Sequence, residues 1–102
     1  MEKKINEKDA INFLLDNLGG SHLSGFAYTA HVIATQSFNN LYGKTSQDYK
    51  INYKHIERSI RYYFYYVENK LGKEKFRKLL NLEPEIKLSN KNIISQITLM
   101  LS

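Results

Sequence analysis

The chain has 102 residues, of which 42% are hydrophobic and 25% charged, and its formal net charge is +5. This length and composition predict one globular domain over residues 1–102 with one modest core, and they exclude a disordered segment. The lack of cysteine excludes disulfides and thiolate metal sites, and no stretch approaches the ~18 apolar residues of a membrane-spanning helix. We therefore expect a cytoplasmic protein with no signal peptide and no membrane partner.

The first third of the chain predicts two helices. The first covers 7–18 and ends at Gly19 and Gly20, because glycine readily adopts the left-handed conformation that closes a helix. Ser21 is the expected N-cap of a second helix over 22–38. The residues expected to face the core from these helices are apolar and recur at helical spacing: Ile11, Leu14, Leu15, Leu18, Leu23, Phe26, Ala27, Ala30, Ile33 and Ala34.

The middle of the chain predicts three more helices. Residues 39–52 favour a short helix followed by a turn. The clearest helix of the chain then covers 52–71, with Gly72 as its stop, and a short helix over 73–80 follows it.

The last part begins with a break at Pro84. Residues 85–88 alternate polar and apolar side chains, which predicts a short strand, and this strand would form a small β-wing if it paired with another. Ser89 or Asn90 is the expected cap of a final helix. The predicted fold is therefore all-α, a helix-turn-helix domain of five to six helices, with the wing as an open variant.

The 52–71 helix divides into two faces at 100° per residue. Its inward residues are apolar or aromatic: Ile56, Ile60, Tyr63, Phe64 and Val67. Its outward residues are basic or aromatic, with Glu57 and Tyr62 on the flanks: Lys54, Arg58, Arg61 and Tyr65. An α-helix fits the major groove of B-DNA, where arginine can bond guanine, while lysine and tyrosine can hold phosphates. The structural alternatives are an ion pair between Glu57 and Arg61 and packing of the outward tyrosines against the chain terminus or a second subunit.

Charge is concentrated in the same region. Residues 44–78 hold ten basic and four acidic side chains, so a local excess of positive charge lies on a nearly neutral body. This pattern favours a polyanionic partner, with nucleic acid first, although a solvated charged face explains it equally well. The cluster at the end of this stretch is likewise either a phosphate-contact patch or a soluble helix surface: Lys73, Lys75, Arg77 and Lys78.

Enzymatic chemistry has little support in the sequence. His22, His31 and His55 lack the spacing of metal ligands, and Ser21 with His22 has no orienting acid. The early glycines are not followed by the Gly-Lys-Ser/Thr of a phosphate loop, and the acids of 7–18 look like a solvated face. We therefore expect no enzymatic activity, metal, cofactor or small-molecule substrate.

The run LYGKTSQDYKINYKHIERSIRYYFYYVE, residues 41–68, resembles the helix-turn-helix of a known family. That family is the C-terminal effector domain of the sporulation initiation (stage-zero) response regulators of endospore-forming bacteria. Its recognition-helix core is similar to Ile56-Glu57-Arg58-Ser59-Ile60-Arg61 here. GGSHLSGFAY (19–28) and LSNKNIISQI (88–97) resemble two further family segments. This sequence shows no receiver domain, its link over 33–41 is shorter, and Tyr62 stands where the family has a histidine.

The resemblance implies an all-helical DNA-binding domain that acts in pairs, as a homodimer or as tandem copies on DNA. It implies that Glu57 and Arg58 reach base edges, that Arg61 reads or braces the backbone, and that Lys54 and His55 lie near phosphates. With the residues favoured by charge and exposure, the predicted DNA contacts are Lys54, His55, Glu57, Arg58, Arg61, Tyr62, Tyr65, Lys73 and Lys75.

Three functions follow from the sequence. The first is a sequence-specific double-stranded DNA-binding protein that regulates transcription. The second is a DNA-binding accessory factor that marks a plasmid transfer, replication or partition site for a larger complex. The third belongs to another class, a protein-interaction module that dimerises through the aromatic helix.

Overall fold

The computed structural model describes residues 5–36 and 40–102, and within them the chain forms six helices and no strand. The helices are α1 (Glu7–Asn17), α2 (Ser24–Thr35), α3 (Gly43–Tyr49), α4 (Tyr53–Leu71), α5 (Lys73–Leu79) and α6 (Asn90–Leu101). The predicted all-α class is confirmed, and α3, a three-residue turn and α4 follow one another in helix-turn-helix order. None of the helices in the described part of the chain is both long and apolar enough to cross a membrane.

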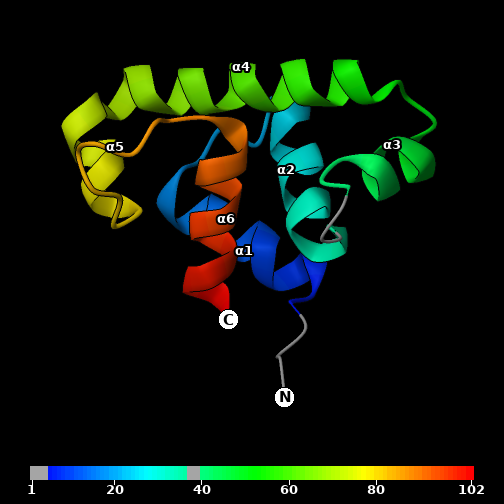
Figure 1. The fold of residues 1–102 in the computed structure, drawn as a ribbon, viewed down its shortest axis with the longest axis horizontal. Helices are drawn as coiled ribbons and strands as arrows, with labels where there is room; N and C mark the ends of the chain where they lie inside the picture. Colours follow the sequence, from blue (N-terminus) through cyan, green and yellow to red (C-terminus); the bar gives the residue numbers. More distant parts are fainter. Residues whose placement is uncertain (1–4, 37–39) are drawn as a thin grey trace.

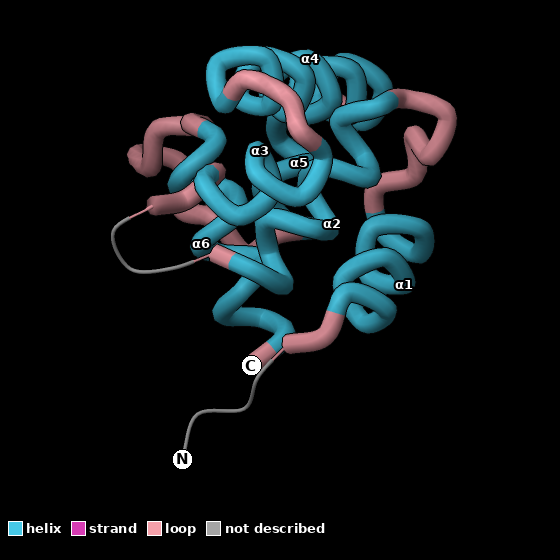
Figure 2. Tube along the Cα trace, turned by 90° about the vertical axis from the view of Figure 1, so that its right-hand side faces the viewer, coloured by secondary structure: helices cyan, strands magenta, loops and turns pink. Residues whose placement is uncertain are grey.

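One long helix lies across the rest of the molecule. Figure 1 shows α4 along one side, with α1, α2 and α6 beneath it and with α3 and α5 at its two ends. Figure 2, turned by 90°, shows no helix beyond α4 on that side, and the C-terminus at the end of α6 lies opposite. One face of α4 is therefore left uncovered by the other helices.

The sequence explains the limits and the inward face of α4. The Asn52 side chain accepts a hydrogen bond from the Lys54 backbone N–H at 2.8 Å, and Gly72, at φ 89°, ends the helix. The five residues predicted to face inward are all buried, as expected from their helical angles: Ile56, Ile60, Tyr63, Phe64 and Val67.

The contact between α2 and α4 is unusually close. A Cβ atom on Gly25 would lie 2.2 Å from the Ser59 carbonyl oxygen and 2.6 Å from Cβ of Tyr63. The Tyr63 ring packs edge-on against Phe26 with 5.8 Å between ring centroids, and its hydroxyl donates to the Gly19 carbonyl at 2.7 Å. Glycine at position 25 therefore lets the two backbones touch, and Tyr63 fills the space beside that contact.

The start of α2 differs from the prediction. The helix begins at Ser24 instead of His22, and its N-cap is Leu23 without a side-chain cap, so Ser21 does not cap it. The reason is a turn after Gly20, closed by the Leu23 N–H on the Gly20 carbonyl at 3.0 Å. Residues 37 and 38, at the predicted end of this helix, lie outside the described residues.

Two predicted core residues point outward. Leu15 is 49% exposed, because α1 packs on one side only and buries Ala10 and Leu14. Ala27 is also exposed. On α2 the buried set is wider than one stripe and includes Tyr28, since α2 contacts four other helices.

The strand predicted over 85–88 is wrong, and no wing forms in the described residues. The Arg77 guanidinium donates to the carbonyls of Glu83 and Ile86, both at 2.8 Å, and the Ile86 N–H bonds the Glu83 carbonyl. These bonds fold the segment after Pro84 into a turn, so its backbone groups are not presented to a partner strand. The predicted Ser89 cap is confirmed by its bond from the Asn92 N–H.

We predict that Gly25→Ala destabilises the fold by about 1–3 kcal/mol or more, although alanine has the better helix propensity, because its methyl group overpacks the contact between α2 and α4. Urea denaturation measures the change. Ser24→Ala, at the exposed neighbouring position, is the control and should change stability by less than about 0.5 kcal/mol. Equal stability of the Gly25→Ala variant and the parent protein would contradict the close contact.

Candidate nucleic-acid interface

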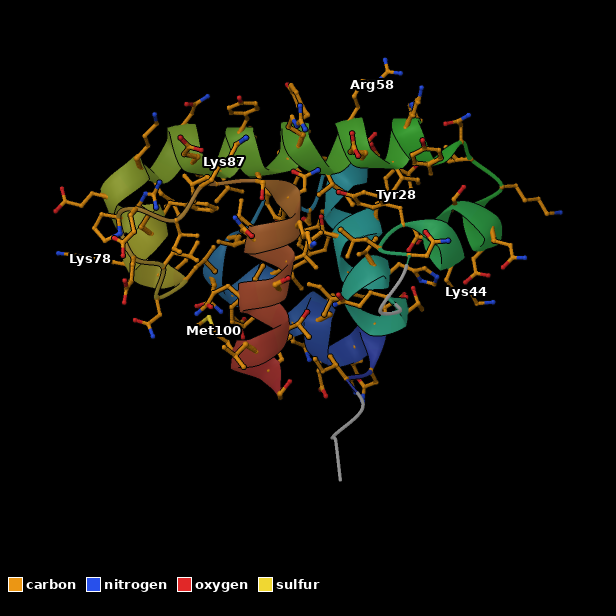
Figure 3. The ribbon with its side chains drawn as sticks, in the orientation of Figure 1. Tyr28, Lys44, Arg58, Lys78, Lys87 and Met100 are labelled. Carbon is orange, nitrogen blue, oxygen red and sulfur yellow. The ribbon has the colours of Figure 1, made fainter. Side chains whose placement is uncertain are left out.

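The outward face of α4 carries basic and aromatic side chains. Tyr62 is 63% exposed and Tyr65 is 57% exposed. Figure 3 shows Arg58 projecting from α4 away from every other helix. The structure thus brings six of the nine predicted DNA contacts together on one surface, which we call the α4 face: Lys54, His55, Arg58, Arg61, Tyr62 and Tyr65.

This surface lacks negative charge. The two acids of α4 are Glu57, which is half-buried, and Glu68, which is buried and lies 4.0 Å from the Lys73 ammonium group. The Arg58 and Arg61 side chains make no hydrogen bond or ion pair within the parts of the chain that the structure describes. The alternative ion pair between Glu57 and Arg61 is accordingly not formed there, and both guanidinium groups are available to a partner.

Glu57 lies at the edge of the α4 face. Its backbone carbonyl accepts a hydrogen bond at 3.0 Å from the buried Asn90 side chain, which also bonds the Tyr42 hydroxyl at 3.3 Å. These bonds anchor the first turns of α4 to the start of α6. Of the two residues predicted to reach base edges, Arg58 is therefore the more accessible.

A shallow, open hollow borders the α4 face. It lies between the beginning of α2 and the outward side of α4, and no sequence pattern predicts it. Its lining combines residues at the start of α2 with mostly basic and aromatic residues of α4: Leu23, Ser24, Gly25, His55, Arg58, Ser59, Arg61, Tyr62 and Tyr65. A ligand that lies over α4 would therefore also meet the first turn of α2.

The aromatic character continues toward the end of α4. The half-buried Tyr66 ring meets His22 edge-on with 5.3 Å between centroids, and the Lys70 ammonium group lies 6.0 Å from the Tyr66 centroid. Tyr53, at the other end of the helix, is 52% exposed and was not among the predicted contacts. Its position at the first helical residue, next to Lys54, is the signal that could have indicated it.

The basic residues of α5 divide into two groups. Lys73 and Lys75 are exposed on α5, which turns away from α4 after Gly72 (Figure 1), so they are not part of the α4 face. Lys78 is exposed further along α5 (Figure 3). Arg77 instead holds the loop after α5, so it has a structural role in the cluster.

Comparison with models of known protein families, with curated proteins and with solved structures finds no match for this chain. The likeness to the sporulation regulator effector domain therefore depends on the quoted sequence motifs, and the function has to be argued from the surface itself.

We predict that Arg58→Ala and Arg61→Ala each change the free energy of unfolding by less than about 0.5 kcal/mol, because neither guanidinium supports the fold. Ile60→Ala, on the buried side of the same helix, should cost about 2–5 kcal/mol. Thermal and urea denaturation compare the three variants. A loss above 1 kcal/mol for either arginine variant would show that the arginine has a structural role.

Proposed function

We propose that this protein binds double-stranded DNA sequence-specifically and uses α4 as its recognition helix. The observation that carries the proposal is the α4 face, on which basic and aromatic side chains are exposed without an exposed acid on the helix. Such a surface is suited to a polyanion whose base edges lie between two rows of phosphates.

The dimensions of α4 support this assignment. The helix has 19 residues and is therefore about 28 Å long, more than twice the ~12 Å width of the major groove that admits an α-helix. The turn that carries Glu57 and Arg58 can enter the groove, while outward residues before and after it reach the flanking backbones. Arg58 and Glu57 then carry base preference, whereas Lys54, Arg61 and Tyr65 contribute phosphate contacts.

The turn before α4 fits the same arrangement. Helix-turn-helix motifs join their helices by three or four residues, often including a glycine. Here residues 50–52 form the turn, and Lys50 adopts a left-handed φ of 56°, the conformation that glycine usually supplies. Lys50 is exposed, so the turn adds a positive charge next to the start of α4.

The resemblance to the sporulation regulators supports binding as a homodimer or as tandem copies. Transcription regulation is our first proposal for the cellular role, and marking of a plasmid transfer, replication or partition site is the second. The genomic neighbourhood separates these roles, because conjugation or replication genes beside this gene favour the accessory role. DNA footprinting then shows whether the bound site overlaps a promoter or an origin.

A protein-interaction module is the candidate from a different class. The exposure of Tyr62 and Tyr65 favours it, because aromatic residues are enriched in protein interfaces. It requires no binding to duplex DNA, or only weak binding that does not depend on base sequence.

The test begins with a duplex selected from random sequences, for which we expect affinity that falls steeply with salt as phosphate counterions are released. Arg58→Ala should weaken binding to this duplex by about 1–3 kcal/mol and relax the base preference at one base pair. Lys54→Ala, which removes a proposed phosphate contact, should weaken binding to all duplexes alike and lower the salt slope by about one. Fluorescence anisotropy at several ionic strengths measures both effects.

Lys8→Ala is the matched control, because Lys8 is exposed on α1, away from α4, and should leave the affinity unchanged. Duplex binding that is insensitive to salt, or an Arg58→Ala variant with unaltered affinity and base preference, would refute the assignment of α4 as recognition helix. Dimerisation without duplex binding would favour the interaction module.

A further inference from the structure

The His31 side chain links α2 both to α1 and to α3, the first helix of the helix-turn-helix. His31 of α2 meets Glu7 of α1 through Nδ1 and meets Asp48 of α3 through Nε2, the second at 2.8 Å. An ionised carboxylate only accepts hydrogen bonds, and a neutral imidazole has a single N–H donor. Both bonds can form together only when the ring is protonated, so this contact is complete only with a positively charged His31.

The surroundings of His31 favour that charged state. Burial lowers the pKa of His31, but its hydrogen bonds with Asp48 and Glu7 raise the pKa by more, so that it lies above the ordinary value of 6.5. The bonds with His31 and with Lys44 lower the pKa of Asp48 below its ordinary value of 3.8. Lys44, whose ammonium group lies 3.1 Å from Asp48, is the nearby cation, and Tyr49 and Tyr28 are the other titratable neighbours.

Helix α3 has few other attachments to the body. Thr45 is the buried residue among its seven. The Tyr49 ring packs edge-on against Tyr28 and His31, with 5.1 Å and 5.2 Å between centroids, yet Tyr49 remains 38% exposed. Leu41, Tyr42 and Ile51, which flank α3, pack against the core, and the His31 contacts add the polar link from α3 to α1 and α2. Helix α3 leads through the three-residue turn into the first residues of α4.

We propose that His31 is a positioning residue for DNA binding: its protonated ring fixes α3 and, through the turn, the beginning of the α4 face, so that duplex affinity follows the protonation of His31. The inference rests on the proposed function, which it extends by naming a regulation of the same surface.

The direction of the pH effect follows from the sign of the shift. A group whose pKa is higher in the folded protein stabilises the fold fully below its unfolded value and loses this contribution as pH rises through the folded value. The contribution of His31 to stability is thus complete at pH values below 6.5, and it is lost as the pH rises through the higher pKa of the folded protein. At the acidic end it lasts until Asp48 is protonated, below 3.8. Duplex affinity should accordingly be constant near pH 6 and fall toward pH 8.

The experiment has to separate His31 from the other histidines. His55 is a second histidine and lies on the α4 face itself, so all measurements use a His55→Gln background. His31→Gln then tests the proposal, and His22→Gln is the matched control, because His22 lies beside Tyr66, outside the proposed contacts. Anisotropy with a selected duplex at constant ionic strength covers pH 5.5 to 8.5, and NMR follows the titration of the His31 ring.

We expect about a tenfold loss of affinity across this range, equivalent to about 1.4 kcal/mol, with a midpoint that coincides with the NMR titration of His31. His31→Gln should bind weakly and show no such pH dependence, whereas His22→Gln should retain it. Affinity independent of pH, or an unchanged pH profile in His31→Gln, would overturn the proposal.

A second readout needs no DNA. Hydrogen exchange of the amides in α3, corrected for intrinsic rates, should show protection at pH 6 that falls at pH 8 and is missing in His31→Gln, while α4 stays protected. If this pattern holds but no duplex binds at any pH, the proposed function fails and the positioning of α3 by His31 stands. If duplexes bind but the protection of α3 is the same with and without His31, the proposed function stands and this inference fails.

Discussion

The close contact between α2 and α4 at Gly25 is the constraint on which the arrangement of this domain depends. Helix α2 contacts α1, α3, α4 and α6, so the distance that Gly25 permits sets where α4 lies relative to most of the fold. Tyr63 completes the contact, because its ring fills the space beside the glycine and its hydroxyl is satisfied by the Gly19 carbonyl. Because one face of α4 is packed against α2 in this way, the opposite face is exposed to solvent.

The tyrosines of α4 show how one residue type serves both faces. Tyr63 is fully buried, and burial raises its pKa, so its hydroxyl remains a neutral donor to the Gly19 carbonyl. Tyr62 and Tyr65 are separated from it by 100° and 200° of helical rotation and expose their rings and hydroxyls. Changes on the outward side therefore alter the surface without removing core contacts, so the chemistry of the α4 face and the stability of the fold can vary separately.

Periodicity predicted the inward face of α4 and failed where distant parts meet. The inward residues of α4 and its Asn52 cap follow from local spacing, which the chain itself fixes. The contact of His31 with Glu7 and Asp48 joins residues 24 and 17 positions apart, and no sequence pattern indicates such a meeting. The sequence instead predicts that Glu7 belongs to a solvated face. At residues 85–88 the sequence predicts an element that does not form, because alternation over four residues leads to a strand only if a partner strand is present.

The burial and pairing of acids explain why the outward side of α4 is basic. In the 44–78 region, Asp48 is held by His31 and Lys44, Glu68 is buried near Lys73, and Glu57 is recessed at the side of α6. Glu74, on α5, is the remaining acid of this stretch. Two of these four carboxylates, Asp48 and Glu68, thus lie beside basic groups, while Arg58 and Arg61 keep their charges free. A partner that supplies a continuous row of anionic oxygens matches this distribution better than a mixed protein surface, which supports duplex DNA over a protein partner.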